Sequence, residues 1–294
     1  MTAAAARPTH AVEDPDASWV APDISGLVTE DDTPVDNILS EKQERLLTEP
    51  LYSSWSGPPP GEDGEPRRFA ALANVGLFSS PGERPLVPDM MLSVDVAIAD
   101  DLSDKLNRSY FIWQFGKPPE VVVEIVSNRE GGELGERFGR YRRMRVSYYV
   151  VYDPLHALGE PVLRGFELRG DLYVPVVRPW FETIGLGLIE WDGVFEGLQG
   201  RWLRWCTLDG HVVPTGAERA ATGAERAETA EARAETAEAR AETADVRAET
   251  ADVRAETAEA RAGTAEARAG TAEARATRLA ARLRELGIDP NGDG

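Results

Sequence analysis

The sequence predicts an α/β fold, in which a mixed β-sheet with flanking helices is followed by a long C-terminal α-helix. Apolar runs at residues 90–98, 121–126 and 146–152 have the length and the Val/Ile content of buried strands. Residues 133–144, between the second and third runs, carry apolar side chains at the spacing of an amphipathic helix. Arginine recurs at every seventh position from Arg219 to Arg282, which indicates a coiled-coil helix.

Composition divides the chain into four segments. We expect residues 1–40 to be disordered, because a segment rich in Ala, Pro, Asp and Thr buries too little apolar surface to offset its ordering entropy. A globular domain is predicted over residues 41–210, since all seven Trp precede Pro214. A heptad-repeat helix is predicted over 211–287, and a short disordered tail over 288–294.

Charge and composition exclude several classes of protein. A formal charge of −19 argues against broad electrostatic wrapping of nucleic acid, because Lys and Arg supply the affinity for phosphates. It leaves room for a local basic patch of Arg129, Arg137, Arg140, Arg142, Arg143 and Arg145. The single Cys206 excludes an intrachain disulfide and a cysteine zinc cluster. Without a long apolar run or a signal-peptide pattern, we expect a cytoplasmic protein with no membrane span.

The first predicted elements precede the run at 90–98. Ser40 is expected to cap a helix over residues 41–48, with Gln43 completing the capping pattern, and Pro50 is expected to end it. The apolar run at 69–78 lacks strict alternation, so it fits either a strand or a helix.

The middle of the chain predicts a strand, a helix and a strand. The near-continuous Val and Ile of residues 121–126 suit a strand that is buried on both faces. The helix expected at 133–144 has one apolar stripe, formed by Leu134, Phe138 and Tyr141. With a third run at 146–152, this spacing is typical of a parallel crossover unit.

Further strands are predicted after this unit. Residues 162–168 and 170–175, the second of which begins with Gly170, have the pattern of an antiparallel hairpin. Residues 180–191 and 195–206 are expected to add short strands.

The heptads of the tail predict self-association. With Arg at position g, Ala occupies positions a and d, and the same frame continues into Leu279, Leu283 and Leu286. Arg at g would reach Glu at e of a parallel neighbouring helix, whereas no Arg of the central repeats lies three or four residues from a Glu of its own helix. A parallel homo-oligomer is therefore expected, and a solvated single helix is the alternative.

Two acidic residues stand at the predicted strands. Asp89 precedes the first run, and Glu124 lies inside the second, where a carboxylate is costly to bury unless it is paired or bound to a metal. Two acids that converge from neighbouring strands would suit Mg²⁺ or Mn²⁺ and the cleavage of nucleic acid. The alternative is a pair of surface or capping carboxylates.

These motifs, taken in order, resemble the Uma-type restriction endonuclease family of the PD-(D/E)xK nuclease superfamily. The resemblance covers about residues 85–155 and rests on Pro88-Asp89, Glu124-Ile125-Val126-Ser127, Glu133-Leu134-Gly135-Glu136-Arg137, Tyr141 and the run from Val146 to Pro154. It implies a restriction-endonuclease-like α/β core and DNA as the partner. It also implies a Mg²⁺ or Mn²⁺ ion held by Asp89, Glu124 and the backbone carbonyl of Ile125.

One position departs from the superfamily pattern. The superfamily lysine would stand two residues after Glu124, where this chain has Val126, and the family's displaced lysine matches Arg137. Arginine keeps the charge but does not exchange a proton near neutral pH, so Arg137 is assigned to transition-state stabilisation. The expected function is a metal-dependent endonuclease that hydrolyses DNA phosphodiester bonds. The alternatives are a catalytically weakened interaction module assembled by its coiled coil, and a structural assembly factor with a passive head.

Overall fold

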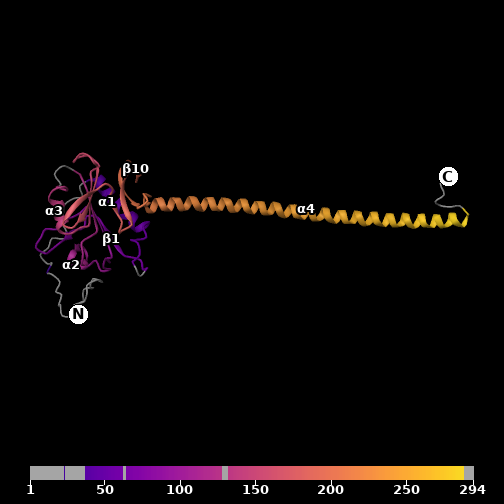
Figure 1. Ribbon diagram of the computed structural model, residues 1–294, viewed down its shortest axis with the longest axis horizontal. Helices are drawn as coiled ribbons and strands as arrows, with labels where there is room; N and C mark the ends of the chain where they lie inside the picture. The colour runs from indigo at the N-terminus through magenta and orange to yellow at the C-terminus, as the bar shows by residue number, and fades with distance from the viewer. Residues whose placement is uncertain (1–22, 24–36, 62–63, 128–131, 288–294) are drawn as a thin grey trace, which may run out of the picture. The chain divides into compact units, whose positions relative to one another are not determined.

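The computed structural model of the chain describes residue 23 and residues 37–61, 64–127 and 132–287 (Figure 1). The chain divides into two units, Met1–Ala221 and Thr222–Gly294. The predicted disordered segments, 1–40 and 288–294, lie outside the described residues except for residue 23 and residues 37–40. The predicted disorder and domain limits stay predictions.

The elements follow one another from a helix into a series of strands. In chain order they are α1 (Ile38–Ser53), β1 (Phe69–Leu72), β2 (Leu77–Phe78), β3 (Met90–Val94), the 3-10 helix η1 (Lys105–Asn107), β4 (Tyr110–Phe111), α2 (Ile112–Phe115), β5 (Val121–Ile125), α3 (Glu136–Arg143), β6 (Tyr148–Tyr152), β7 (Leu163–Arg169), β8 (Leu172–Val176), β9 (Trp180–Phe181), β10 (Leu186–Phe195), β11 (Leu198–Thr207) and α4 (Gly216–Glu285).

The largest sheet is mixed, which confirms the predicted α/β class. Its strand order is β1-β3-β5-β6-β7-β8. Strands β5 and β6 are parallel and are joined through α3, so the predicted crossover unit is confirmed. The predicted hairpin is also confirmed, because β7 and β8 pair antiparallel.

Smaller sheets account for the remaining strands. In the sheet β11-β10-β9, strands β10 and β11 pair over ten residues each, so the short strands expected there are in fact a long hairpin. The run at 69–78, which fitted either a strand or a helix, forms two strands in different sheets. Strand β1 joins the large sheet, and β2 pairs with β4 in parallel.

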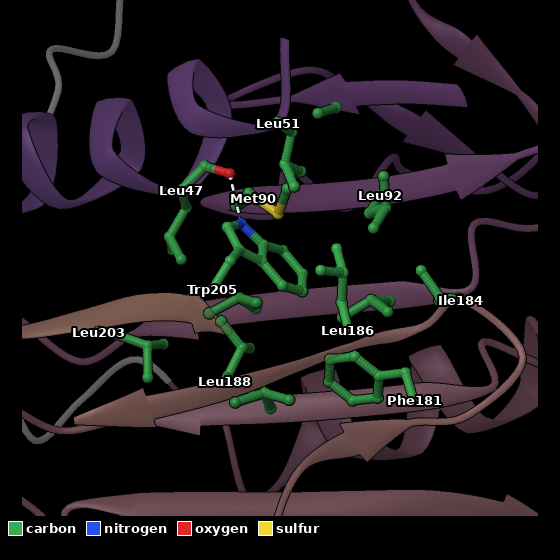
Figure 2. Close-up of a cluster of buried hydrophobic side chains, with 14 of the residues drawn as sticks. Leu47, Leu51, Met90, Leu92, Phe181, Ile184, Leu186, Leu188, Leu203 and Trp205 are labelled. Carbon is green, nitrogen blue, oxygen red and sulfur yellow. Dashed lines mark hydrogen bonds between the residues drawn. The ribbon is translucent and has the colours of Figure 1, made fainter. Parts of the chain in front are cut away.

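Two hydrophobic clusters cover the two faces of the large sheet. Figure 2 shows one of them, where Leu47 and Leu51 of α1 and Met90 and Leu92 of β3 meet side chains of the β9–β11 region. The indole Nε1 of Trp205 donates to the Leu47 carbonyl oxygen at 2.7 Å in this cluster. The other cluster lies on the α3 side of the sheet and contains Met91, Val122, Tyr141 and Tyr149. Alternation along β5 therefore directs Glu124 to the α3 side.

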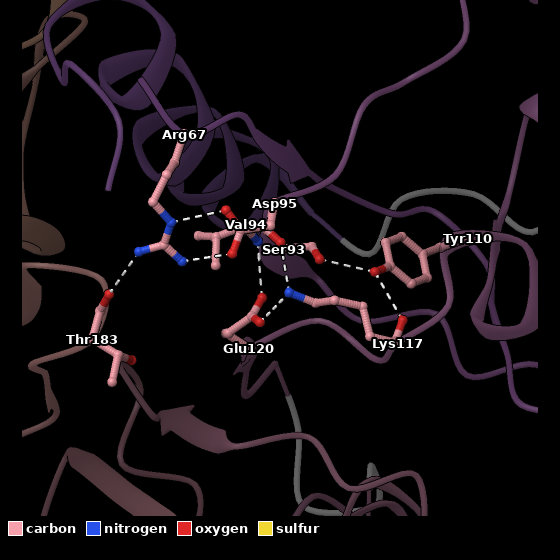
Figure 3. A network of polar contacts seen from close by, with 8 residues as sticks. All are labelled: Arg67, Ser93, Val94, Asp95, Tyr110, Lys117, Glu120 and Thr183. Atoms are coloured by element: carbon pink, nitrogen blue, oxygen red, sulfur yellow. Dashed lines mark hydrogen bonds and ion pairs between the residues drawn. The ribbon is translucent and has the colours of Figure 1, made fainter. Parts of the chain in front are cut away.

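A polar network fixes one end of β3 against β5 (Figure 3). The backbone N–H of Val94 donates to Glu120 Oε2 at 2.9 Å, and Lys117 Nζ donates to the Val94 carbonyl oxygen at 2.5 Å and to Glu120. Arg67 holds Asp95 through two hydrogen bonds of 2.6 and 2.8 Å. Because a slip of one residue would turn every side chain to the opposite face, these contacts protect the register between the two strands.

The first helix differs from its prediction at both ends. Asn37 is the N-cap, with its Oδ1 accepting from the Ser40 backbone N–H at 3.0 Å, so the prediction of Ser40 as the cap was wrong. Pro50 lies inside α1 and does not end it. Burial of Leu47, Pro50 and Leu51 against the core outweighs the helical hydrogen bond that the proline cannot make.

Helix α3 is shorter than its prediction. It covers Glu136–Arg143, residues 133–135 form a turn, and Gly135 is the N-cap. Leu134 is consequently 45% exposed and does not belong to the predicted stripe, whereas Tyr141 is fully buried. Gly132 has a φ of 69°, a left-handed conformation that glycine adopts readily, and its carbonyl oxygen accepts from the N–H of Gly135.

At two sheet edges, side chains form hydrogen bonds with backbone N–H and C=O groups of the edge strand. The Tyr52 hydroxyl accepts from the Ala71 N–H at 2.9 Å and lies 3.1 Å from the Ala71 carbonyl oxygen in edge strand β1. The fully buried Gln43 amide pairs in the same way with Leu203 in edge strand β11, at 2.8 and 2.9 Å. In effect, each of these side chains takes the place of a neighbouring strand.

Helix α4 confirms the predicted long C-terminal helix, running without interruption over Gly216–Glu285. It begins with a capping box, since the Glu218 N–H donates to Thr215 Oγ1 at 3.1 Å and the Thr215 N–H donates to Glu218 Oε2 at 2.8 Å. Arg204 also binds Glu218, with contacts of 2.6 and 2.8 Å. Coiled-coil pairing of this helix stays a prediction.

Candidate active site

The register of β3 and β5 brings the two predicted acids together. Met90 pairs with Val123 and Met91 with Val122 in antiparallel register, so continuing the ladder by one residue places Asp89 opposite Glu124. Directly opposed residues of an antiparallel pair share a face of the sheet. Both acids therefore stand at the same end of the two strands, on the face that α3 covers.

Glu124 is buried and held by two donors. Its side chain is 1% exposed. Oε1 accepts from the Tyr141 hydroxyl at 2.5 Å, and Oε2 accepts from Arg137 Nη1 in an ion pair. Both donors come from α3, where a spacing of four residues places them on one face of the helix. Helix α3 therefore fixes the orientation of this carboxylate.

Asp89 is half-buried and reaches the backbone of the neighbouring strand. Its Oδ2 accepts from the Ile125 N–H at 2.5 Å. Ile125, the last residue of β5, is thus adjacent to both acids. The described contact uses the amide of Ile125, and the predicted metal-ligand role of its carbonyl stays a prediction.

Burial is the main cause that raises the pKa of Glu124, and the negative charge of Asp89 adds to it. Arg137 and the hydrogen bond from Tyr141 act in the opposite direction, and the net pKa is about 8. Burial lowers the pKa of the Arg137 guanidinium, but Glu124 and, to a smaller extent, Tyr141 and Asp89 together raise that pKa by more. Burial also raises the pKa of Tyr141, so its hydroxyl remains a donor. The site therefore contains a carboxyl group whose charge is poorly compensated.

The part of the chain that contains this site matches a known protein family. The Uma2 family model, whose description is "putative restriction endonuclease", matches residues 33–178, which include the large sheet, α3 and both acids. Residues 33–178 are a Uma2-family domain. A search of curated proteins gave no match. The β9–β11 sheet and α4 lie outside the matched residues.

The acids of the Uma2 domain fit a divalent ion with few protein ligands. The part of the chain that the structure describes contains no group of three or more His, Cys, Asp or Glu side chains that could hold a metal. Mg²⁺ commonly uses one or two carboxylates and completes its shell with water and substrate phosphates. A cation beside Asp89 and Glu124 would also relieve the repulsion that raises the pKa of Glu124.

Two further residues of the Uma2 domain belong to the site. The sequence pattern assigned Tyr141 to an apolar stripe, although its spacing from Arg137 was the signal that both could reach Glu124. Glu133 is buried, and its charge contributes to the raised pKa of Glu124. The carbonyl oxygen of Glu133 accepts from the Tyr149 hydroxyl at 2.8 Å, which fixes the turn before α3.

None of the helices in the described part of the chain combines the length and the apolar content needed to cross a membrane.

Proposed function

We propose that the chain is a metal-dependent endonuclease that hydrolyses phosphodiester bonds in DNA. The observation that carries the proposal is the meeting of Asp89 and Glu124 at the ends of β3 and β5, with Arg137 against the buried carboxylate. The match of residues 33–178 to a family described as "putative restriction endonuclease" supports the same function.

Each residue of the site has a separate task in this proposal. Asp89 and Glu124, with the carbonyl oxygen of Ile125, would hold Mg²⁺ or Mn²⁺, and the bound ion would polarise a phosphoryl oxygen and lower the pKa of water. Arg137 stabilises the negative charge that develops on the phosphate. It stays protonated, so the proton of the attacking water must pass to another group. Tyr141 holds Glu124 in place through its 2.5 Å hydrogen bond.

Plasmid cleavage in the presence of Mg²⁺ or Mn²⁺ tests the proposal. Asp89→Asn and Glu124→Gln preserve side-chain shape and remove the charge, so each is expected to abolish cleavage and to weaken Mn²⁺ binding in calorimetry. Asp171→Asn, which changes an exposed carboxylate paired with Arg145, is the matched control and should cleave as the parent does. Cleavage that survives both site substitutions would remove the proposal.

A second candidate function is a nucleic-acid or protein interaction module without catalysis. The ion pair between Arg137 and Glu124 favours it, because the guanidinium already occupies one oxygen of the buried carboxylate and replaces a lysine that could exchange a proton. DNA binding with no cleavage under any divalent ion would support this candidate.

We also propose that α4 assembles copies of the chain into a parallel homo-oligomer. Its leucines continue the heptad frame, and Leu279 and Leu286 are 54% and 67% exposed in the single chain. Arg at g and Glu at e provide complementary charges for a parallel second copy. Sedimentation of the full chain should give a multiple of the 32.1 kDa chain mass. Leu283→Asp should reduce it to the monomer, and an unchanged mass in this variant would contradict the proposal.

A further inference from the structure

Three arginines of α3, Arg140, Arg142 and Arg143, lack the kind of carboxylate partner that Arg137 has in Glu124. Carboxylates pair with Arg45, Arg67, Arg145, Arg164, Arg169, Arg201 and Arg204. Within the residues that the structure describes, no carboxylate forms an ion pair with Arg140, Arg142 or Arg143. In a chain with a formal charge of −19, they form a local group of three neighbouring cations without carboxylate ion pairs among the described residues.

Two of these cations continue a row that starts at the acids. Arg137, Arg140 and Arg143 are three residues apart, so they are neighbours on the helix surface, and each step rises about 4.5 Å along the axis. Arg137 contacts Glu124, whereas Arg143 is exposed. A polyanion at the candidate active site would therefore meet Arg140 and Arg143 as it leaves the acids along α3.

Gly139 leaves the helix surface bare beside this row. A Cβ at this position would meet only Arg143 Nη1, at 3.5 Å, so internal packing does not require glycine here. Glycine inside a helix costs roughly 1 kcal/mol relative to alanine. Its lack of a side chain permits a close approach to the helix beside Arg143.

We propose that Arg140 and Arg143 bind successive backbone phosphates of a DNA strand whose scissile bond lies at Asp89 and Glu124. The inference rests on the proposed function in one respect only, which is that the DNA strand is placed at Asp89 and Glu124. The charge of the chain restricts binding of a polyanion to places where cations stand without carboxylate partners. An anionic lipid surface fits less well, because α3 offers no exposed large apolar side chain to insert into it.

Binding of a fluorescent DNA duplex to the full-length chain, measured by anisotropy over a range of salt concentrations in EDTA, tests this role. EDTA prevents cleavage, so binding is measured whether or not the protein is a nuclease. The test variant is Arg140→Gln/Arg143→Gln, and Arg140→Lys/Arg143→Lys restores the charge. The matched control, Arg68→Gln/Arg169→Gln, removes two charges elsewhere in the same unit. Because Arg140 also donates to the Arg84 carbonyl oxygen, Arg143→Gln alone serves as a variant that leaves this contact intact.

Loss of two phosphate contacts should make the negative slope of log K, the association constant, against log salt shallower by about 1.8. It should weaken binding about 60-fold at 0.1 M salt. Arg143→Gln alone should give about half of the change in slope. The lysine variant should recover most of the affinity, and the control should bind as the parent does.

Equal losses in the control and test variants would overturn the inference, because they would indicate a general effect of charge. An unchanged slope in Arg143→Gln and in the double glutamine variant would also overturn it. So would binding to phosphatidylcholine vesicles that contain phosphatidylserine in the absence of binding to DNA. Selective loss of DNA binding in a chain that never cleaves plasmid would uphold the inference and remove the proposed nuclease function. If the parent cleaves plasmid and the test variant binds DNA as tightly as the parent does, the nuclease function stands and the inference about Arg140 and Arg143 is overturned.

Discussion

The buried carboxyl group of Glu124 should make the folded domain less stable as the pH rises. Its pKa is about 8 in the folded chain, against an ordinary value of 4.5. Between these values the folded state retains a proton that the unfolded state has lost, so the free energy of unfolding falls with increasing pH. The contribution is complete below about pH 4.5 and is lost as the pH passes through about 8. A separation of about 3.5 between the two pKa values corresponds to at most about 5 kcal/mol.

Glu124→Gln isolates this contribution, because it keeps the acceptor for Tyr141 and removes the ionisation. The substitution also deprives Arg137 of its partner, but Arg137 stays charged throughout, so that cost does not vary with pH. Urea unfolding followed by Trp fluorescence reports on the first unit, since all seven Trp precede Cys206. The difference in unfolding free energy between parent and variant should change by several kcal/mol between pH 5 and pH 9.

Glu182→Gln, at an exposed position, is the matched control and should follow the parent at every pH. A parent and a Glu124→Gln variant with parallel pH profiles would refute the reasoning, because the carboxyl group would then titrate alike in the folded and unfolded chains.

Other predictions concern the site and its supports. Arg137→Lys should raise metal-dependent cleavage about tenfold or more, because lysine can exchange a proton, whereas Arg145→Lys should leave the rate unchanged. Gly139→Ala should raise the free energy of unfolding by about 0.5–1 kcal/mol in urea titrations, since glycine disfavours a helix interior and the position has room for a methyl group. Gln43→Leu should destabilise the domain by about 3 kcal/mol, because it leaves a buried N–H and C=O of β11 unpaired, whereas Gln199→Leu at an exposed position should have little effect.

Local patterns predicted the parts of the fold that depend on neighbouring residues. The Val-rich strand β5, helix α3 and strand β6 were found because their periodicity and order fit a crossover unit. The limits of α1 were not found, because Asn37 and Ser40 are both good caps and only burial decides whether a helix continues through Pro50. The length of the β10–β11 hairpin was missed as well, since its exposed half lacks the composition of a core strand.

The candidate site required information that no local pattern contains. Asp89 and Glu124 are far apart in the sequence, and the family resemblance supplied their pairing before the strand register placed them opposite each other. The hydroxyl of Tyr141 was overlooked because an aromatic residue at helical spacing is usually read as core. In the structure it is core, and it also donates to Glu124.

The side chains that stand in for missing strands affect how copies of this protein can meet. An incoming strand at β1 or β11 would have to displace Tyr52 from Ala71 or Gln43 from Leu203, giving up two contacts at the point of entry. Strand addition, the route by which many exposed edges polymerise, is therefore disfavoured at these two positions. In the homo-oligomer proposed for α4, several copies would be held at high local concentration, and these two contacts would lower the risk that their sheets pair with one another.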